Sequence, residues 1–205
     1  MLEMTYEGFA RAVEERAKQS SFLIALCQTL DEYQAFEHGQ GPEQPACCKS
    51  CSFCCHQMVC VFPAEMEEIH THIMRQVSPV RRRLREKIHK AAKEWRAYFE
   101  KHRFSPARIQ HPLRVAEDWF GKPCPLLQED GSCGVYEARP LVCRTTTSPT
   151  RCTEPAHLKD GKHSAQMRYI CEEWANRLFM EEMWRLGAQG VTPMPHFFGM
   201  QQFKV

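Results

Sequence analysis

The chain has 205 residues, of which 43% are apolar and 25% are charged, and its formal net charge is +2 at pH 7. A chain of this length can bury a hydrophobic core within one domain, and the composition is that of an ordinary globular protein. So small a net charge gives no argument for nucleic-acid binding, and no apolar stretch is long enough to span a membrane. Because the first residues also lack the basic and apolar regions of a signal peptide, we expect a single-domain cytoplasmic protein spanning residues 1–205.

The abnormal feature of the composition is its twelve cysteines. A disulfide scaffold would need an oxidising compartment, for which the sequence carries no secretion signal. The vicinal pairs Cys47-Cys48 and Cys54-Cys55 also fit an ordinary disulfide framework poorly. We therefore favour metal ligation over disulfide bonding as the role of these thiols.

The first predicted element is helical and runs from Thr5 to about Phe36, because apolar residues recur there at steps of three and four. A break into two helices is expected at residues 19–21, where Ser20 or Ser21 can cap the second helix. Cys27 lies on the second helix, far in sequence from the other cysteines. We interpret it as a small buried apolar residue rather than a ligand.

A glycine- and proline-containing loop leads to the first cysteine segment, in which Cys48, Cys51, Cys54 and Cys55 read C-x-x-C-x-x-C-C. Two intervening residues allow the chain to bend so that two thiolates reach one metal ion, which is why this spacing recurs in zinc and iron–sulfur sites. His56 follows directly and is a candidate spare ligand or proton shuttle.

Two helices are predicted after this segment. Pro63 suits the first position of one helix, whose early turn is rich in glutamate, and Ser78-Pro79 begins the next. The outer face of this next helix is basic, and we interpret it as a solvated face rather than a nucleic-acid surface. Three Glu-x-x-His pairs, a spacing used in di-iron bundles, are interpreted as chance: Glu67/His70, Glu86/His89 and Glu154/His157.

The second cysteine segment follows a short predicted helix over residues 113–120. It offers Cys124, Cys133, Cys143 and Cys152, separated by eight or nine residues, a spacing that suits loops converging in space. Neither cysteine segment alone supplies a good set of ligands for a complete metal site. We therefore expect the two to meet, with these six thiols lying together: Cys48, Cys51, Cys54, Cys124, Cys133 and Cys143.

The chain ends in a predicted helix from about Ser164 to Leu186, with Tyr169, Ile170, Trp174, Leu178 and Trp184 as its apolar members and Gly187 as a stop. The proline-interrupted tail after it is expected to pack as extended chain.

The motif C-x-x-C-x-x-C-C, followed by Cys124-Pro-Leu-Leu and by Cys133-Gly-Val-Tyr-Glu-Ala-Arg-Pro-Leu-Val-Cys143-Arg, resembles the YkgJ-type cysteine-cluster family. That family is described as zinc- or iron-chelating, and the resemblance covers roughly residues 47–144. It implies a metal centre but no particular reaction. A flagellin lysine N-methylase contains a similar cysteine segment, so a methylase-like, protein-modifying enzyme is one alternative. The sequence has no glycine-rich adenosylmethionine motif to support it.

We therefore predict a mainly α protein whose N- and C-terminal helices flank an irregular cysteine-rich metal-binding core at about residues 47–152. The expected cofactor is zinc or iron. Two four-cysteine zinc sites, or one iron–sulfur cluster with extra thiols, both fit the thiol count, and the spacing does not choose between them. Metal handling or redox is the predicted function, and a structural zinc module for a protein partner is a second alternative. Arg144 and Lys49 are interpreted as cations that balance thiolate charge. No role is assigned to Cys27, Cys47, Cys60 or Cys171 in the metal centre. The predicted ligands are Cys48, Cys51, Cys54, Cys55, Cys124, Cys133, Cys143 and Cys152.

Overall fold

The computed structural model describes residues 2–41, 45–48, 50–102, 112–153, 169–188 and 190–199. The chain divides into two compact units. The helical unit consists of residues 1–47, 137–151 and 164–190, and the cysteine unit of residues 48–136, 152–163 and 191–205. Their boundary near residue 136 falls inside a short 3-10 helix, η2 (Tyr136–Ala138).

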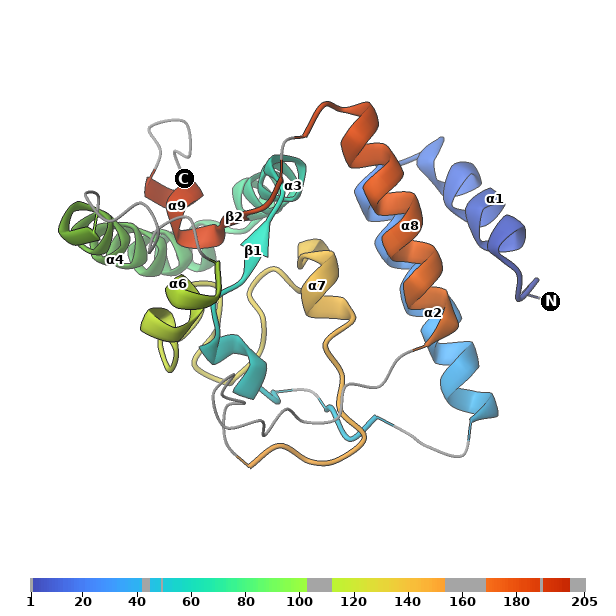
Figure 1. Ribbon diagram of the computed structural model, residues 1–205, viewed down its shortest axis with the longest axis horizontal. Helices are drawn as coiled ribbons and strands as arrows, with labels where there is room; N and C mark the ends of the chain where they lie inside the picture. The colour runs from blue at the N-terminus through green and yellow to red at the C-terminus, as the bar shows by residue number, and fades with distance from the viewer. Residues whose placement is uncertain are drawn as a thin grey trace. The chain divides into compact units, whose positions relative to one another are not determined.

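The helical unit is built on three helices, α1 (Tyr6–Ala17), α2 (Phe22–Gln40) and α8 (Ile170–Arg185), which contact one another (Figure 1). The short α7 (Leu141–Arg144) contacts α2. The predicted break between the first two helices is confirmed, because the Ser21 side chain caps α2 by accepting a hydrogen bond from the Ile24 amide at 3.3 Å. Phe9 and Tyr33 join α1 to α2 inside the core, with ring centroids 5.0 Å apart in an edge-to-face arrangement.

The buried face of α8 differs from the one predicted. Ile170 and Trp184, which we expected inside, are 48% and 68% exposed. The buried apolar residues follow one another at four-residue steps: Cys171, Ala175, Phe179 and Met183. The prediction failed because it weighted large apolar residues, whereas two small residues, Cys171 and Ala175, form part of the buried stripe.

The end of α8 agrees with the prediction. Gly187 has a φ of +72°, and its amide donates to the carbonyl of Trp184 while the Ala188 amide donates to Met183. A left-handed residue stops the helix and satisfies its last carbonyls, a conformation that glycine adopts at no steric cost. The predicted start, Ser164, lies outside the described residues.

The cysteine unit contains a two-stranded antiparallel sheet of β1 (Cys60–Val61) and β2 (Thr192–Pro193). Its helices are α3 (Pro63–Arg75), α4 (Ser78–His102), α6 (Pro112–Trp119) and α9 (Met194–Gly199), with a 3-10 turn, η1 (Phe53–His56). Pro63 stands at the first position of α3, and the Glu65 carboxylate accepts a hydrogen bond from the Phe62 amide at 2.9 Å. The predicted starts of α3 and α4 are thus confirmed.

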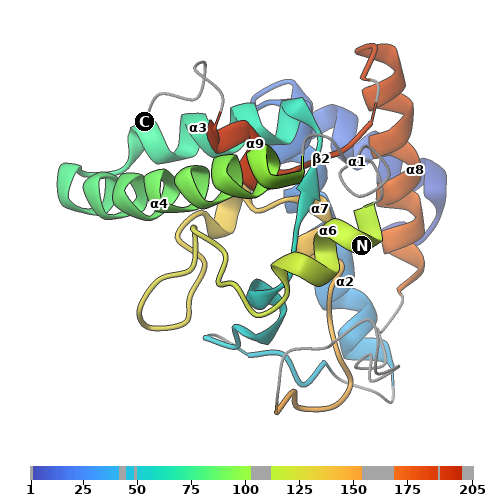
Figure 2. The same ribbon diagram turned by 60° about the vertical axis from the view of Figure 1, so that its left-hand side comes forward.

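The tail is helical over Met194–Gly199, so the expectation of extended chain is wrong beyond β2. This helix packs along α4 (Figure 2), where the Trp95 indole donates to Nδ1 of His196 at 3.1 Å. Burial of Met194 and Phe198 in the core favours the helix despite the proline at position 195, which falls within its first turn.

Overall, the predicted mainly α class is confirmed: helices predominate in both units, around cysteine-bearing loops that have little regular structure. In the part of the chain that is described, no helix has the length and apolarity needed to cross a membrane. The single-domain organisation stays a prediction.

Candidate metal centre

The two cysteine segments of the cysteine unit are joined by backbone hydrogen bonds. The amide of Cys124 donates to the carbonyl of Cys55 at 2.7 Å, and the amide of Gly121 donates to the carbonyl of His56 at 3.0 Å. Figure 2 shows η1, which carries Cys55 and His56, beside the chain that leaves α6. The expected meeting of the two segments is therefore present at the level of the backbone.

A second contact lies at the tip of the next turn. Gly131 has a φ of +79°, and a Cβ atom placed on it would lie 2.7 Å from the carbonyl oxygen of Ser50, in the first segment. Only a residue without a side chain fits this approach and this backbone conformation together. Sequence reasoning missed Gly131, although Asp130-Gly131 is a common turn dipeptide that could have indicated it.

The same turn places Cys124 and Cys133 near each other. The Leu127 amide donates to the carbonyl of Cys124 at 3.0 Å, and Leu127 forms an antiparallel bridge with Cys133. Both cysteines pack, partly buried, against the hydrophobic core formed by α3, α4 and α9. This half of the centre therefore rests on rigid elements.

Burial and neighbouring thiols raise the pKa of several cysteines in this unit. The pKa of the Cys55 thiol is raised by its hydrogen bond with Cys54, by burial, and by the nearby thiols of Cys54, Cys124 and Cys133. Burial raises the pKa of Cys124 to about 12, and Cys133 and Cys54 contribute to the increase. A thiolate disfavours a second negative charge nearby, so these thiols oppose one another's ionisation.

The remaining thiols of the first segment have a different set of neighbours. The pKa of Cys51 is raised first by burial and then by Cys152, Cys54 and Cys48. A backbone hydrogen bond from the Cys51 amide to the Cys48 carbonyl, at 3.0 Å, closes the turn between the first two cysteines. Cys54 thus contributes to the raised pKa of both Cys51 and Cys55.

The cysteine unit therefore contains seven of the eight predicted ligands, and their thiols influence one another. In the described residues, no three cysteine, histidine or acidic side chains are placed so that they hold one ion as they stand. The donor set nevertheless fits a thiophilic metal, because thiolate sulfur is the preferred ligand of zinc and of iron–sulfur centres. Side-chain rotation would have to bring the sulfur atoms to metal-bonding distance.

Cys143 lies on α7 and belongs to the helical unit. Its expected association with the other cysteines stays a prediction. The adjacent Arg144 is 2% exposed, and its guanidinium donates to Asp31 and to the carbonyl of Glu137, both at 2.5 Å. The ion pair with Asp31 gives Arg144 a role in joining α7 to α2, and its predicted balancing of thiolate charge stays a prediction. Lys49 lies outside the described residues.

His56 is oriented as a ligand could be. Its Nδ1 lies 3.0 Å from the carbonyl oxygen of Ser52. A carbonyl can only accept, so Nδ1 carries the proton and Nε2 presents its lone pair. A backbone carbonyl behind one ring nitrogen is the usual support for a histidine that binds metal through the other.

The other predictions concern residues outside this centre. Cys27 is buried, as expected. Glu86 and His89 are exposed, in agreement with their interpretation as chance neighbours, whereas Glu154 and His157 lie outside the described residues. Cys171 is buried in the helical unit, where its thiol donates to Glu37 at 3.0 Å and burial raises its pKa.

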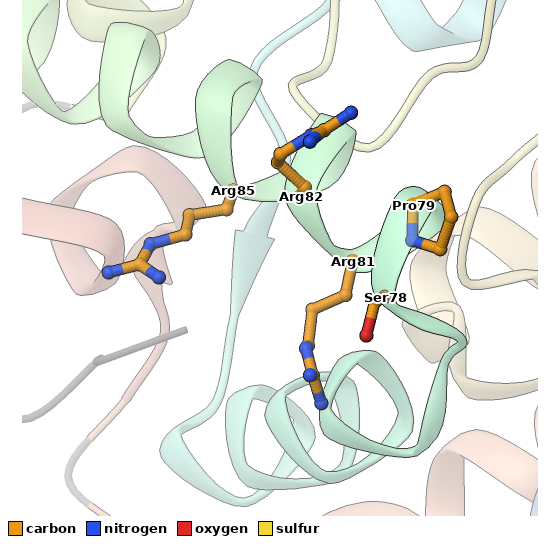
Figure 3. Close-up of a pocket in the computed structure, with 5 residues that line it drawn as sticks. All are labelled: Ser78, Pro79, Arg81, Arg82 and Arg85. Atoms are coloured by element: carbon orange, nitrogen blue, oxygen red, sulfur yellow. The ribbon is translucent and has the colours of Figure 1, made fainter.

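The basic start of α4 contains a pocket of about 320 Å³ lined by Ser78, Pro79, Arg81, Arg82 and Arg85. The three guanidinium groups point in different directions (Figure 3), so they do not converge on one anion. Arg81 donates to the carbonyl of Met74. This arrangement agrees with the interpretation of the basic face as solvated.

Comparison with known proteins gives one match. The family model CxxCxxCC, described as "Putative zinc- or iron-chelating domain", matches residues 47–172, a range that contains all eight predicted ligands. No curated protein and no solved structure matches the chain significantly. Because the matched range is more than half of the chain and includes both cysteine segments, the protein belongs to the CxxCxxCC family of zinc- or iron-chelating domains.

Proposed function

We propose that the cysteine unit binds zinc or iron through thiols of both cysteine segments, and that the protein acts in metal handling or redox chemistry. The observation that carries the proposal is the hydrogen bond from the Cys124 amide to the Cys55 carbonyl, which joins the segments beside their thiols. The ligands in this unit are Cys48, Cys51, Cys54, Cys55, Cys124, Cys133 and Cys152.

The surroundings of these thiols support metal binding over a catalytic thiol. A nucleophilic cysteine needs its pKa lowered by a nearby cation. Burial raises the pKa of Cys51, Cys60 and Cys124 instead, and the pKa of Cys55 is raised through Cys54. Such thiols are protonated and unreactive near neutral pH, and a metal ion is the partner that would displace their protons.

Metal analysis of anaerobically purified protein tests the proposal. Protein should be produced in medium supplied with iron and, separately, with zinc, and the iron, zinc and acid-labile sulfide per chain should be measured. We expect iron-loaded protein to be brown, with charge-transfer absorption near 400 nm that bleaches on reduction. Colourless protein with stoichiometric zinc under both conditions would identify zinc as the metal, and protein without metal under both would reject the proposed function.

Handling and redox roles differ in how the metal is held. A protein that hands metal on should lose it to a competing chelator without unfolding. A redox protein should keep the metal through repeated cycles of reduction and oxidation, with full recovery of the absorption band. Metal retention during both treatments therefore distinguishes the two roles.

A further inference from the structure

The corner at which the chain passes from α3 to α4, residues 74–85, is strongly basic and carries exposed apolar side chains. We propose that this α3–α4 corner docks an acidic segment of a partner protein. Carboxylates of the segment would lie against Arg82 and Arg85, and an apolar side chain of the segment against Met74 and Val77. The inference goes beyond the proposed metal function and is independent of it, because it involves none of the cysteines.

Positive charge is concentrated in this part of the chain. Between Glu68 and Glu86 the sequence contains five arginines and no aspartate or glutamate. Over its whole length α4 contains nine of the 27 lysines and arginines but only three of the 25 acidic residues, so the rest of the chain has more acidic than basic residues. The small net charge of the chain therefore conceals a local surface that attracts anions.

The arginines at the start of α4 differ from those of the helical unit in their ion pairing. Arg82, Arg83 and Arg85 are exposed, and no carboxylate in the part of the chain that the structure describes pairs with them. Their guanidinium groups are therefore available to carboxylates of another molecule. In the helical unit, four arginines pair with glutamates: Arg11 with Glu3, Arg16 with Glu32, Arg177 with Glu181 and Arg185 with Glu182.

The position of these arginines is unfavourable for α4 itself. The first turn of α4 has no acidic residue, and cations near a helix N-terminus oppose the helix dipole. Arg81 and Arg85 are four residues apart, a spacing at which like charges destabilise a helix. Carboxylates of a partner would offset both effects, which gives the charge pattern a physical reason that solvation alone does not.

Exposed apolar side chains adjoin the arginines. Met74 is 43% exposed and Val77 is 68% exposed. Arg81 connects the two, because its guanidinium donates to the Met74 carbonyl at 3.1 Å and its amide donates to the Val77 carbonyl at 3.0 Å. Arg81 also lines the pocket of about 320 Å³ at the start of α4. An apolar patch bordered by charged groups is typical of a surface that binds protein.

A protein segment fits the α3–α4 corner better than a nucleic acid does. Nucleic-acid binding uses a basic surface that follows many phosphates, whereas Glu86 and Glu94 interrupt the basic face beyond Arg85. Met74 and Val77 offer contacts to an apolar side chain and none to a phosphate. The guanidinium groups of the pocket point in different directions (Figure 3), which suits separate carboxylates along a segment.

The test is fluorescence anisotropy of labelled probes titrated with the full chain, produced in zinc-supplied medium. One probe is a peptide of Glu-Glu-Leu repeats, the second is a peptide of Glu-Glu-Ser repeats, and an oligouridylate of similar charge represents nucleic acid. We expect the Glu-Glu-Leu peptide to bind most tightly, with an affinity that falls as ionic strength rises. Absence of binding, equal binding of the two peptides, or tighter binding of the oligouridylate would overturn the proposal.

Matched charge reversals locate the surface. Arg82→Glu combined with Arg85→Glu should weaken binding of the Glu-Glu-Leu peptide by about tenfold or more, because repulsion replaces attraction. Lys90→Glu combined with Lys93→Glu changes the net charge equally, at exposed positions farther along α4, and should have a much smaller effect. Equal losses in the two double variants would show nonspecific attraction to the helix and would overturn the assignment to the α3–α4 corner.

Val77→Ser tests the apolar contact. It should weaken binding of the Glu-Glu-Leu peptide and leave that of the Glu-Glu-Ser peptide unchanged, since it removes no charge. The same effect on both peptides, or none on either, would contradict the apolar contact. All substituted positions are exposed, so we expect every variant to fold, as judged by circular dichroism. Metal content should be unchanged in every variant, so failure of the docking proposal would leave the proposed metal function intact.

Discussion

The backbone amide of Cys124 donates a hydrogen bond of 2.7 Å to the carbonyl oxygen of Cys55, which joins two segments that are far apart in the sequence. The contact involves no side chain, so it is independent of whether either thiol is protonated. This hydrogen bond positions the thiols of the two segments, and a bound metal would then link the segments through those thiols. The stability of this unit and its affinity for metal should therefore be linked.

Substitution of Gly131 tests this link. Gly131→Ala places a methyl group against the Ser50 carbonyl at 2.7 Å and strains a left-handed residue. The strain alone costs about 1 to 2 kcal/mol, and the clash adds to it, so we expect both the free energy of unfolding and the affinity for zinc to fall. Gly121→Ala is the matched control, because Gly121 has the same φ of +79° but nothing within 4 Å of the added methyl group. Equal losses in the two variants would show that the contact with Ser50 is unimportant.

Removal of ligands should lower metal content and stability together. We expect Cys51→Ser and Cys124→Ser to bind less metal and to melt at lower temperature than the metal-loaded protein, because binding free energy contributes to folding. Cys27→Ser should retain its full metal content, since Cys27 is buried in the helical unit. Equal metal content in all three variants, measured by elemental analysis, would show that the ligands have been wrongly chosen.

Cys143→Ser separates the eight-cysteine ligand set expected from the sequence from the seven-thiol centre. Cys143 lies in the helical unit, so a centre built from the seven thiols of the cysteine unit predicts unchanged metal content in its absence. A lower stoichiometry in this variant, determined by native mass spectrometry, would favour the eight-cysteine set.

Metal affinity should rise steeply with pH. The ligands bind as thiolates, so each must lose a proton that burial and neighbouring thiols retain. Because burial raises the pKa of Cys124 from 9.0 to about 12, we expect the affinity for zinc to keep increasing above pH 9. Calorimetry in buffers with different ionisation enthalpies should show proton release on binding. An affinity that levels off below pH 9 would contradict the expected protonation of the thiols.

Acid should weaken the packing of α9 on α4. Nδ1 of His196 accepts a hydrogen bond from Trp95, which the protonated ring cannot do, and burial lowers the pKa of His196 below 6.5. The unfolded chain therefore binds the proton more readily than the folded chain does. The contact contributes fully to the stability of the folded state above pH 6.5, and this contribution is lost as the pH falls through the lowered pKa of His196. The melting temperature of metal-free protein should therefore fall less with acid in His196→Asn than in the unmodified chain. His89→Asn, at an exposed position on α4, should behave as the unmodified chain does.

The buried Arg144 should be important for the helical unit. Arg144→Met removes the guanidinium that donates to the Glu137 carbonyl and to Asp31, and hydrogen bonds of a charged group contribute about 1.5 to 3 kcal/mol. Asp31 is 44% exposed and can be solvated by water in the variant. We therefore expect the free energy of unfolding, measured with denaturant, to fall by about 2 kcal/mol. Arg11→Met, in an ion pair that is more than half exposed, should leave stability nearly unchanged. Similar effects of the two substitutions would show that Arg144 does not fix α7.

Local sequence determined the features that depend on neighbouring residues. Ser21 caps α2, Pro63 opens α3 and Gly187 ends α8 because each acts through its own backbone conformation or through an amide within three residues. The C-x-x-C-x-x-C-C pattern likewise identified the family, because its chemistry lies in residue type and spacing.

Tertiary structure decided what depends on contacts between distant segments. The sequence did not reveal that the buried stripe of α8 starts at Cys171, or that the tail forms a helix on α4, because both depend on the surfaces against which they pack. It predicted that the two cysteine segments meet, but not which backbone contacts join them. The backbone bond between Cys55 and Cys124, and the close approach of Gly131 to Ser50, bring the second cysteine segment against the first. Such pairings are set by the packing energy of the whole unit, which no single segment contains.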